Sequence, residues 1–359
     1  DLISGMEYTF TTCGGSTWDT QLSVYDVTGA VALEYNDDDC GLQSTIVIVA
    51  IASVTVHVLL DEYDCQNSGT CADLTISCAV PPPPIVFTSS NLPIVVINTL
   101  GGAGIPDDPK IDATMGIIYN GPGVVNNLTD PFNEFDGDIG IERRGSSSGG
   151  FPKNQWGLET RDPSGAKIEV SIFNMAYDND WVLYAPYSDK SLLRNVLSYK
   201  MGWDTEQYAP RTKLCEVILN GNYQGVYVFT EKIKRKDGKV GNNDVEPEDI
   251  SGNEITGDYI LKVDKTTAGN STIWTSPFPP YFGAPGLINI QAHDPELDSL
   301  VPVQMTYIEN VVTAFETALA GPNFSDPVLG YAPYIDRGSY IDFMLVNEFG
   351  KNVDGYRIS

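Results

Sequence analysis

Three segments decide how the larger part of the chain folds. They are Ile141-Glu-Arg-Arg-Gly-Ser-Ser-Ser-Gly-Gly-Phe-Pro-Lys153, Asp180-Trp-Val-Leu-Tyr-Ala-Pro-Tyr-Ser-Asp-Lys-Ser-Leu-Leu-Arg194 and Val217-Ile-Leu-Asn-Gly-Asn-Tyr-Gln-Gly-Val-Tyr-Val-Phe-Thr-Glu231. The first joins a strand-like run to a loop of small residues and a lysine. The second leads into a helix. The third places Asn-Gly between two strand-like runs, which is typical of a hairpin.

Further elements extend this mixed pattern on both sides of the three segments. Strands are predicted at 92–98, 140–144, 155–160, 215–219 and 226–230. One helix is predicted at 190–200, capped by Ser188. A second helix carries an apolar face of Met305, Ile308, Val312, Phe315 and Leu319. A third runs from Asp336 to Gly350, with its inward residues expected to be Ile341, Met344, Leu345 and Phe349.

The first 78 residues differ sharply in composition from the rest. They hold twelve Asp and Glu but no Lys or Arg, and five of the six cysteines. Short strands and turns predict an all-β module here, and the clustered cysteines indicate disulfides in an oxidising compartment. We expect the pairs Cys13–Cys40 and Cys65 with Cys71 or Cys78. A zinc site that uses His57 is the alternative.

The chain therefore predicts two domains joined by a spacer. Residues 1–78 form the acidic β module, 79–87 a linker with four successive prolines, and 88–359 the mixed domain. Four prolines favour an extended polyproline II conformation. Both ends of the chain are expected to be cut, within the first domain and within a motif of the second.

The charge excludes several classes of partner. A formal net charge of −27 repels nucleic acid phosphates and anionic lipid, so nucleic acid is not an expected partner. The apolar run from Ile46 to Leu60 is too short to span a membrane. Any site for an anion such as ATP needs a local group of cations or a metal ion.

The two histidines, His57 and His293, lie in different predicted domains. Serine, cysteine and zinc hydrolase mechanisms that depend on histidine are therefore disfavoured. A cationic loop offers different chemistry. Arg143 and Arg144 precede the small-residue loop, and Lys153 follows it, so backbone and cations can approach a phosphate together. The alternative is a flexible loop whose arginines pair with Glu142 or Glu159.

Taken together, the three segments resemble the CotH family, whose members are secreted or surface-associated proteins with an atypical protein-kinase fold. The resemblance covers roughly residues 88–359 and implies an α+β, kinase-like fold that binds ATP with Mg²⁺ or Mn²⁺. It implies phosphate contacts for Arg143, Arg144 and Lys153. Glu231 would anchor that lysine or lie near the nucleotide base.

The segment after the last predicted helix resembles the family's catalytic loop. In Lys351-Asn-Val-Asp-Gly-Tyr-Arg357, the resemblance implies that Asp354 orients the acceptor hydroxyl. Asn352 would support catalysis and hold the metal together with Glu348. The family's second metal-binding aspartate follows in a Trp-Asp motif, which this chain does not reach. The polypeptide is thus expected to be inactive as it stands.

The N-terminal part has a resemblance of its own. Residues 19–29 and 34–44 resemble the pre-peptidase C-terminal domain, a small β-sandwich appended to secreted bacterial enzymes. Asp37, Asp38 and Asp39 offer carboxylate ligands for Ca²⁺. The alternative is a solvated acidic turn.

Two functions from different classes follow. The first is a bacterial kinase, secreted or at the cell surface, that phosphorylates Ser or Thr of an extracellular or coat protein. The second is a non-catalytic surface or adhesion protein that uses the same scaffold to bind a protein or polysaccharide. The 19 tyrosines and five tryptophans suit the second function as well.

Overall fold

The computed structural model describes residues 1–14, 18–39, 41–62, 73–80, 86–145, 147–241, 244–264, 271–280, 286–352 and 355–356. It divides into two compact units, Asp1–Val86 and Phe87–Ser359. The division falls at the end of the predicted linker, whose prolines lie outside the described residues. None of the helices in the described ranges combines the length and apolarity needed to cross a bilayer.

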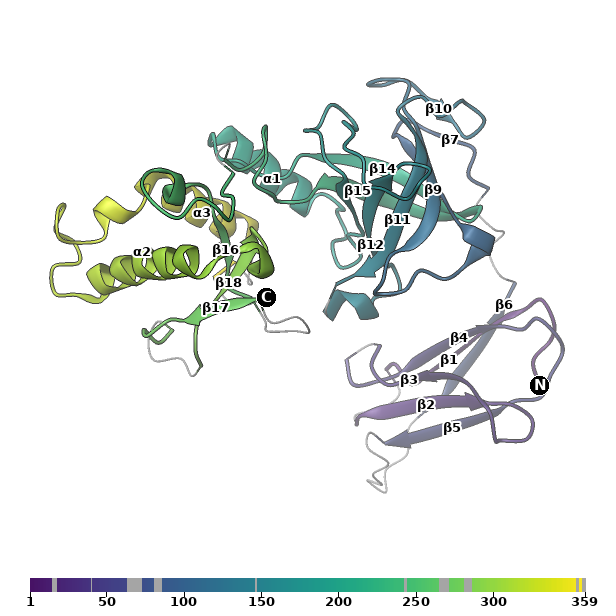
Figure 1. Ribbon diagram of the computed structural model, residues 1–359. Helices are drawn as coiled ribbons and strands as arrows, with labels where there is room; N and C mark the ends of the chain where they lie inside the picture. Colours follow the sequence, from purple (N-terminus) through teal and green to yellow (C-terminus); the bar gives the residue numbers. More distant parts are fainter. Residues whose placement is uncertain are drawn as a thin grey trace. The chain divides into compact units, whose positions relative to one another are not determined.

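The described residues of unit 1 form strands and connecting turns, without a helix (Figure 1). One antiparallel sheet has the order β4-β1-β6 and the other β3-β2-β5. Alternate residues such as Phe10 on β1 and Leu22 on β2 point into one core that both sheets share. The predicted all-β module is therefore confirmed. Its strands are β1 (Glu7–Thr11), β2 (Thr20–Tyr25), β3 (Ala32–Asn36), β4 (Thr45–Val49), β5 (His57–Glu62) and β6 (Thr75–Ala79).

The cysteines give a partial outcome. Cys13 is disulfide-bonded, whereas Cys78 is free and exposed. The alternative pair Cys65–Cys78 is therefore wrong. Cys40, Cys65 and Cys71 lie outside the described residues, so the other pairings stay predictions.

Unit 2 is centred on a closed seven-stranded barrel of order β11-β12-β13-β15-β14-β8-β9 (Figure 1). All neighbours are antiparallel except β14 and β8, which are parallel. Asn220 and Gly221 both have positive φ, 49° and 77°, which suits the tight turn of the β14–β15 hairpin. The barrel strands are β8 (Ile94–Thr99), β9 (Ile111–Ile118), β11 (Phe135–Arg144), β12 (Gln155–Arg161), β13 (Asp180–Tyr184), β14 (Thr212–Leu219) and β15 (Asn222–Glu231).

The barrel interior is the main hydrophobic core. Ile141, Trp181 and Phe229 are almost completely buried there, and Leu183 lies beside them. Because side chains alternate along a strand, Val182 and Val228 point to the outer face instead. The predicted strands and the core roles of Trp181 and Leu183 are thus confirmed.

The remaining elements form a smaller core and a pair of helices. In the sheet β16-β18-β17, Trp274 and Ile290 pack with Ile308 of α2. Helices α1 and α3 contact each other. The bounds are β7 (Ser89–Ser90), β10 (Asn126–Asn127), β16 (Ile260–Lys262), β17 (Thr272–Thr275), β18 (Asn289–Asp294), α1 (Arg194–Asp204), α2 (Pro302–Ala320) and α3 (Arg337–Gly350). Short 3₁₀ helices span Leu100–Gly102, Ser147–Gly150, Glu254–Thr256, Leu297–Ser299 and Ala332–Tyr334.

Two predictions about helices need correction. Helix α1 starts at Arg194, with Leu193 rather than Ser188 at its N-cap. Asp189 organises the turn before it by accepting hydrogen bonds from the backbone N–H groups of Ser191 and Arg194. Helix α3 has the expected bounds, with Asp336 as its cap. The residues expected to be inward are exposed by 46–76%: Ile341, Met344, Leu345 and Phe349.

The reason is that α3 turns its polar side inward. Asn347 is 7% exposed, and Ser339 and Asp342 line the space between α3 and α1. Helix α2 keeps more of its predicted face, because Met305, Ile308 and Val312 pack into the smaller core while Leu319 is exposed. Overall, the chain combines helices and strands behind an all-β N-terminal unit. The kinase-like arrangement stays a prediction.

Candidate active site

The outer face of the barrel forms one wall of a cavity of about 410 Å³. Val182 on β13 and Val228 on β15 form an apolar floor, for the reason of alternation given above. Tyr199 of α1 and His293 of β18 close the other side. Arg144 reaches the cavity from the end of β11, so the cationic loop and the barrel wall meet at this place.

Arg144 is one of two described cationic residues that line this cavity, the other being Lys232. The acids expected to neutralise Arg144 are engaged elsewhere: Glu142 binds Lys110 at 2.8 Å, and Glu159 binds Arg161 and Lys167 at 3.0 and 2.9 Å. Among the described residues, Arg144 forms no ion pair. Desolvation lowers the pKa of Arg144, and the nearby Glu142 carboxylate opposes that shift. The guanidinium nevertheless stays charged at any ordinary pH.

The loop after Arg144 needs glycine at its first position. Gly145 has φ of 113°, a conformation that other residues rarely adopt, and a Cβ there would lie 2.3 Å from Ser148 Oγ. That hydroxyl accepts a hydrogen bond from Gln155 Nε2 at 2.7 Å. The loop is thereby held against the start of β12.

Arg143 does not share the cavity, although the sequence placed both arginines in one phosphate site. Consecutive strand residues point to opposite faces, so Arg143 lies on the interior side with Ile141. Its Nε is buried without a hydrogen-bond partner, and its backbone N–H donates to Pro106 O at 2.6 Å. The predicted pair of phosphate-binding arginines is therefore separated by the sheet itself.

Lys153 is also committed elsewhere. Its ammonium donates to Val226 O at 2.6 Å and lies 4.5 Å from the centre of the Tyr227 ring. Desolvation lowers the pKa of Lys153, although Cys215 and Glu216 oppose the shift. Lys153 is not among the residues that line the cavity.

Glu231 lines the cavity but is not the partner of Lys153. Its carboxylate binds Arg211 Nη1 at 2.9 Å and accepts from the backbone N–H groups of Arg211 and Ala176 at 2.8 and 3.2 Å. Lys153 contacts β15 at Val226, five residues away, which is about 17 Å along an extended strand. The prediction that Glu231 anchors this lysine is therefore wrong. Its predicted place near a nucleotide base stays open.

A second cavity, of about 770 Å³, lies between α1 and α3. Both cavities are lined by Tyr184, Asn195 and Tyr199, so they adjoin one another. Asn195 and Tyr199 are four residues apart on α1 and therefore share one face of the helix. The sequence analysis missed these two residues, although their spacing in a predicted helix was a readable signal.

Asn352 lines the second cavity just after the end of α3. Its Nδ2 donates to Asn347 Oδ1 at 2.9 Å, and its backbone N–H donates to Asn347 O at 3.0 Å. Gly355 packs so closely that a Cβ would lie 2.0 Å from Asn347 Oδ1. The buried Asn347 thus fixes how the chain leaves the helix. Sequence reasoning missed this residue too.

Glu348, the predicted metal ligand, is not among the residues that line the two cavities. Glu348 is exposed. Tyr356, its hydrogen-bond partner, has a raised pKa because of desolvation and the Glu348 carboxylate. Asp354 lies outside the described residues. The residues that line the two cavities therefore include Arg144, Glu231 and Asn352 from the predicted set.

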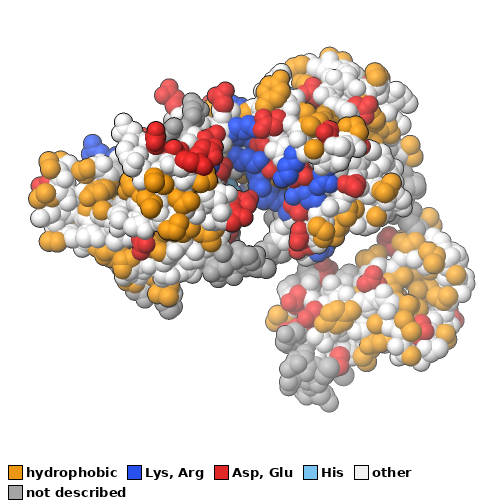
Figure 2. Space-filling view, in the orientation of Figure 1, with side chains coloured by type: hydrophobic (Ala, Val, Ile, Leu, Met, Phe, Trp, Pro, Cys, Tyr) orange, Lys and Arg blue, Asp and Glu red, His pale blue; other side chains and the backbone are white. Residues whose placement is uncertain are grey.

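Cations concentrate near these cavities. On the face shown in Figure 2, Lys and Arg side chains gather in a band beside the barrel. The chain as a whole carries −27. Many of the cations of unit 2 are paired with acids, as Arg161 and Lys234 are, so Arg144 is the one that bears on an anion site here.

A comparison with known protein families finds a match for each of the two parts of the chain. Residues 141–359 match the family described as CotH kinase protein. The match covers more than half of the chain, and the protein belongs to the CotH kinase family. Residues 1–80 match a separate domain of unknown function, DUF8695. The resemblance of that part to the pre-peptidase C-terminal domain stays a prediction. No curated protein matches the chain.

Proposed function

We propose that this CotH-family protein is a kinase that transfers the γ-phosphoryl group of ATP to Ser or Thr of an extracellular or surface protein. The observation that carries the proposal is the Arg144 guanidinium, which lines a cavity with an apolar floor and forms no ion pair with any described residue. Charged, bidentate donors of this kind suit phosphate oxygens. Val182 and Val228 offer a surface on which a flat base can lie.

In this proposal, one of the two adjoining cavities holds the phosphates of ATP and the other holds the catalytic segment. Arg144 would hold phosphate charge in the first cavity. The segment after α3 would approach from the second, where Asn347 fixes the side-chain amide of Asn352. By family resemblance, Asp354 would accept the proton of the acceptor hydroxyl. Mg²⁺ or Mn²⁺ would neutralise the phosphate charge, with Asn352 and Glu348 as proposed ligands.

The decisive comparison is between two adjacent arginines. Arg144→Gln removes a cavity cation, and Arg143→Gln removes a cation on the opposite face of the same strand. We expect Arg144→Gln to raise the Kd of Mn²⁺–ATP by about tenfold or more, because hydrogen bonds to charged groups contribute about 1.5–3 kcal/mol. Arg143→Gln should leave it within about twofold. Isothermal titration of the folded variants measures both values.

Equal losses in both variants, or none in either, would contradict the assignment of Arg144. Phosphoryl transfer is then followed with labelled ATP and Mn²⁺ on the full-length protein, beside an Asp354→Asn variant. Incorporation that disappears in this variant supports the kinase and its catalytic aspartate.

The alternative is a non-catalytic surface or adhesion protein on the same scaffold. It predicts a folded protein that neither binds Mn²⁺–ATP nor incorporates label. The titration therefore separates the two functions before any acceptor protein is known.

A further inference from the structure

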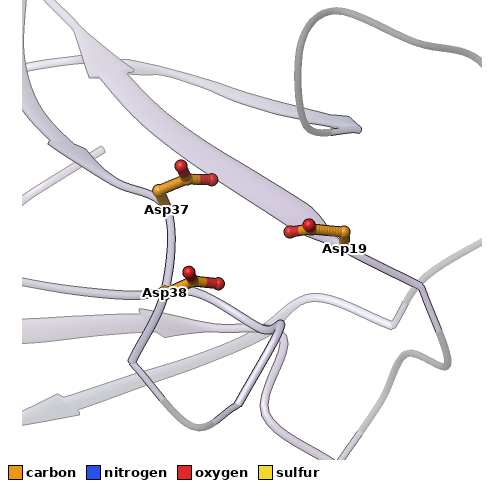
Figure 3. Close-up of side chains that lie close together, drawn as sticks. All are labelled: Asp19, Asp37 and Asp38. Carbon is orange, nitrogen blue, oxygen red and sulfur yellow. The ribbon is translucent and has the colours of Figure 1, made fainter. Parts of the chain in front are cut away.

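Three carboxylates meet in unit 1, far in sequence from the candidate active site. Asp19, Asp37 and Asp38 each offer one oxygen, and these oxygens all lie within 4.8 Å of one another (Figure 3). Asp19 precedes β2, while Asp37 and Asp38 follow β3. The antiparallel register, with Leu22 opposite Asn36, brings the start of β2 beside the end of β3.

Two of these carboxylates each have one oxygen that is shielded from water. The Oδ1 atoms of Asp19 and Asp37 are buried and accept no hydrogen bond from the residues that the structure describes. The same is true of Oε2 of Glu62, which lies on β5 opposite Thr20. Burial of a carboxylate oxygen without a partner is costly, and native structures rarely leave one so. A solvated acidic turn does not account for these buried carboxylate oxygens.

Counter-charge within this unit is lacking as well. The chain has no Lys or Arg before Lys110. In unit 2, by contrast, the buried carboxylates of Asp178 and Glu231 are paired with Lys239 and Arg211. The charge that neutralises this cluster has to come from solution.

We propose that Asp19, Asp37 and Asp38 bind a Ca²⁺ ion, with Glu62 beside them. Ca²⁺ takes six to eight oxygen ligands at about 2.3–2.6 Å, so two ligands on opposite sides of the ion lie about 4.8 Å apart. The three carboxylate oxygens lie within this distance of one another. The sequence had suggested Asp37, Asp38 and Asp39, and the structure replaces the exposed Asp39 with Asp19. The ion ties the start of β2 to the turn after β3.

The test uses the whole chain, stripped of metal with EGTA. Calcium is titrated into wild type, Asp37→Asn and Asp39→Asn, which remove the same charge from neighbouring positions of one turn. We expect a Kd on the order of 10⁻⁴–10⁻³ M for wild type, as in extracellular calcium modules. Asp37→Asn should weaken binding by about tenfold or more, whereas Asp39→Asn should match wild type.

Thermal unfolding gives a second readout. Saturating calcium should raise the Tm of unit 1 by several degrees in wild type and Asp39→Asn, but not in Asp37→Asn. Without calcium, Asp37→Asn should be at least as stable as wild type, because it removes a repelling charge. A purely structural role for Asp37 predicts the opposite order.

Terbium luminescence keeps the proposal testable if Asp37→Asn fails to fold. Trp18 directly precedes Asp19, so bound Tb³⁺ should be excited through this indole, and the signal should fall in Trp18→Phe. Calcium should displace the terbium. No calcium-dependent signal, equal weakening in Asp39→Asn, or an equal effect of Mg²⁺ would each overturn the assignment.

Discussion

At the scale of single residues, Asp178 is a buried charge of unit 2 that is held by two lysines. It is completely buried, pairs with the equally buried Lys239, and binds Lys234 Nζ at 2.9 Å. Lys234 also binds Asp180 at 2.6 Å. Burial raises the pKa of Asp178, but the hydrogen bonds from Lys239 and Lys234 outweigh it, so the pKa is lowered. This network joins β13 and the residue pair before it to residues 232–239, the lysine-rich segment after β15.

Asp178→Asn should therefore destabilise the protein strongly. The expected loss is about 3–5 kcal/mol in the free energy of unfolding, because a buried lysine is left without its counter-charge. Denaturant titration measures it. Asp178→Leu combined with Lys239→Met removes both charges and should recover most of the loss. A small effect of the single substitution would contradict the network.

The same pair sets a pH dependence with a definite sign. The pKa of Asp178 is lower in the folded protein than the value of about 3.9 in the unfolded chain. Its contribution is therefore fully present above that value and is lost as pH falls through the folded pKa. We expect wild type to lose stability more steeply than the double variant below about pH 4. Parallel slopes would show that Asp178 does not carry the effect.

Residue identities predicted the chemistry of the candidate site better than its geometry. Arg144 was identified as a phosphate-contacting residue from the small-residue loop that follows it, and it does line a cavity. Arg143 was given the same role, because a sequence does not show which face of a strand will carry the cleft. The sequence does show that neighbouring side chains of a strand point to opposite faces. Which of the two faces lines the cavity depends on how the barrel closes. The predicted pairing of Glu231 with Lys153 was wrong for a similar reason, since its partner Arg211 comes from a segment that showed no motif.

At the scale of elements, strands were predicted more accurately than helix faces. The β14–β15 hairpin follows from Asn220-Gly221, a local signal. Helix α3 carries apolar residues on several sides, and its buried face is decided by α1 packed against it. The apolar pattern therefore predicted that a helix exists but not which side of it faces inward.

Substitution of two phenylalanines, one in the barrel and one on α3, tests which side chains are buried. Phe229 is completely buried in the barrel, whereas Phe349 on α3 is 76% exposed. Phe229→Ala should cost about 3–5 kcal/mol of unfolding free energy. Phe349→Ala should change it by no more than about 0.5 kcal/mol. Denaturant midpoints compare the two, and a large effect at Phe349 would mean that α3 packs with the other face inward.

At the scale of the whole molecule, the barrel does not coincide with the family match. The match begins at Ile141, within β11, whereas β8 and β9 lie before it. Closure requires both strands, because β9 pairs with β11 and β8 with β14. The sequence did not predict a closed barrel, since closure rests on partners that are distant in the chain and leave no local signature.

Removal of residues 1–140 should accordingly open the barrel. Two unpaired strand edges and part of the apolar core would be exposed, and such edges favour association between chains. We expect residues 141–359 to aggregate, while residues 87–359 stay monomeric. Size-exclusion chromatography with light scattering compares them. A monomeric, cooperatively unfolding 141–359 would show that β8 and β9 are dispensable.

The parallel pairing of β8 with β14 also affects when the barrel can close during synthesis of the chain. Ile94 is paired with Glu216, about 120 residues later in the chain. During synthesis from the N-terminus, β8 is made long before its partner. Pairings at such separation form slowly, because a long loop must close first. Until β14 has been synthesised, one edge of β8 therefore keeps its backbone N–H and C=O groups unpaired. During that interval the nascent protein most needs protection by chaperones.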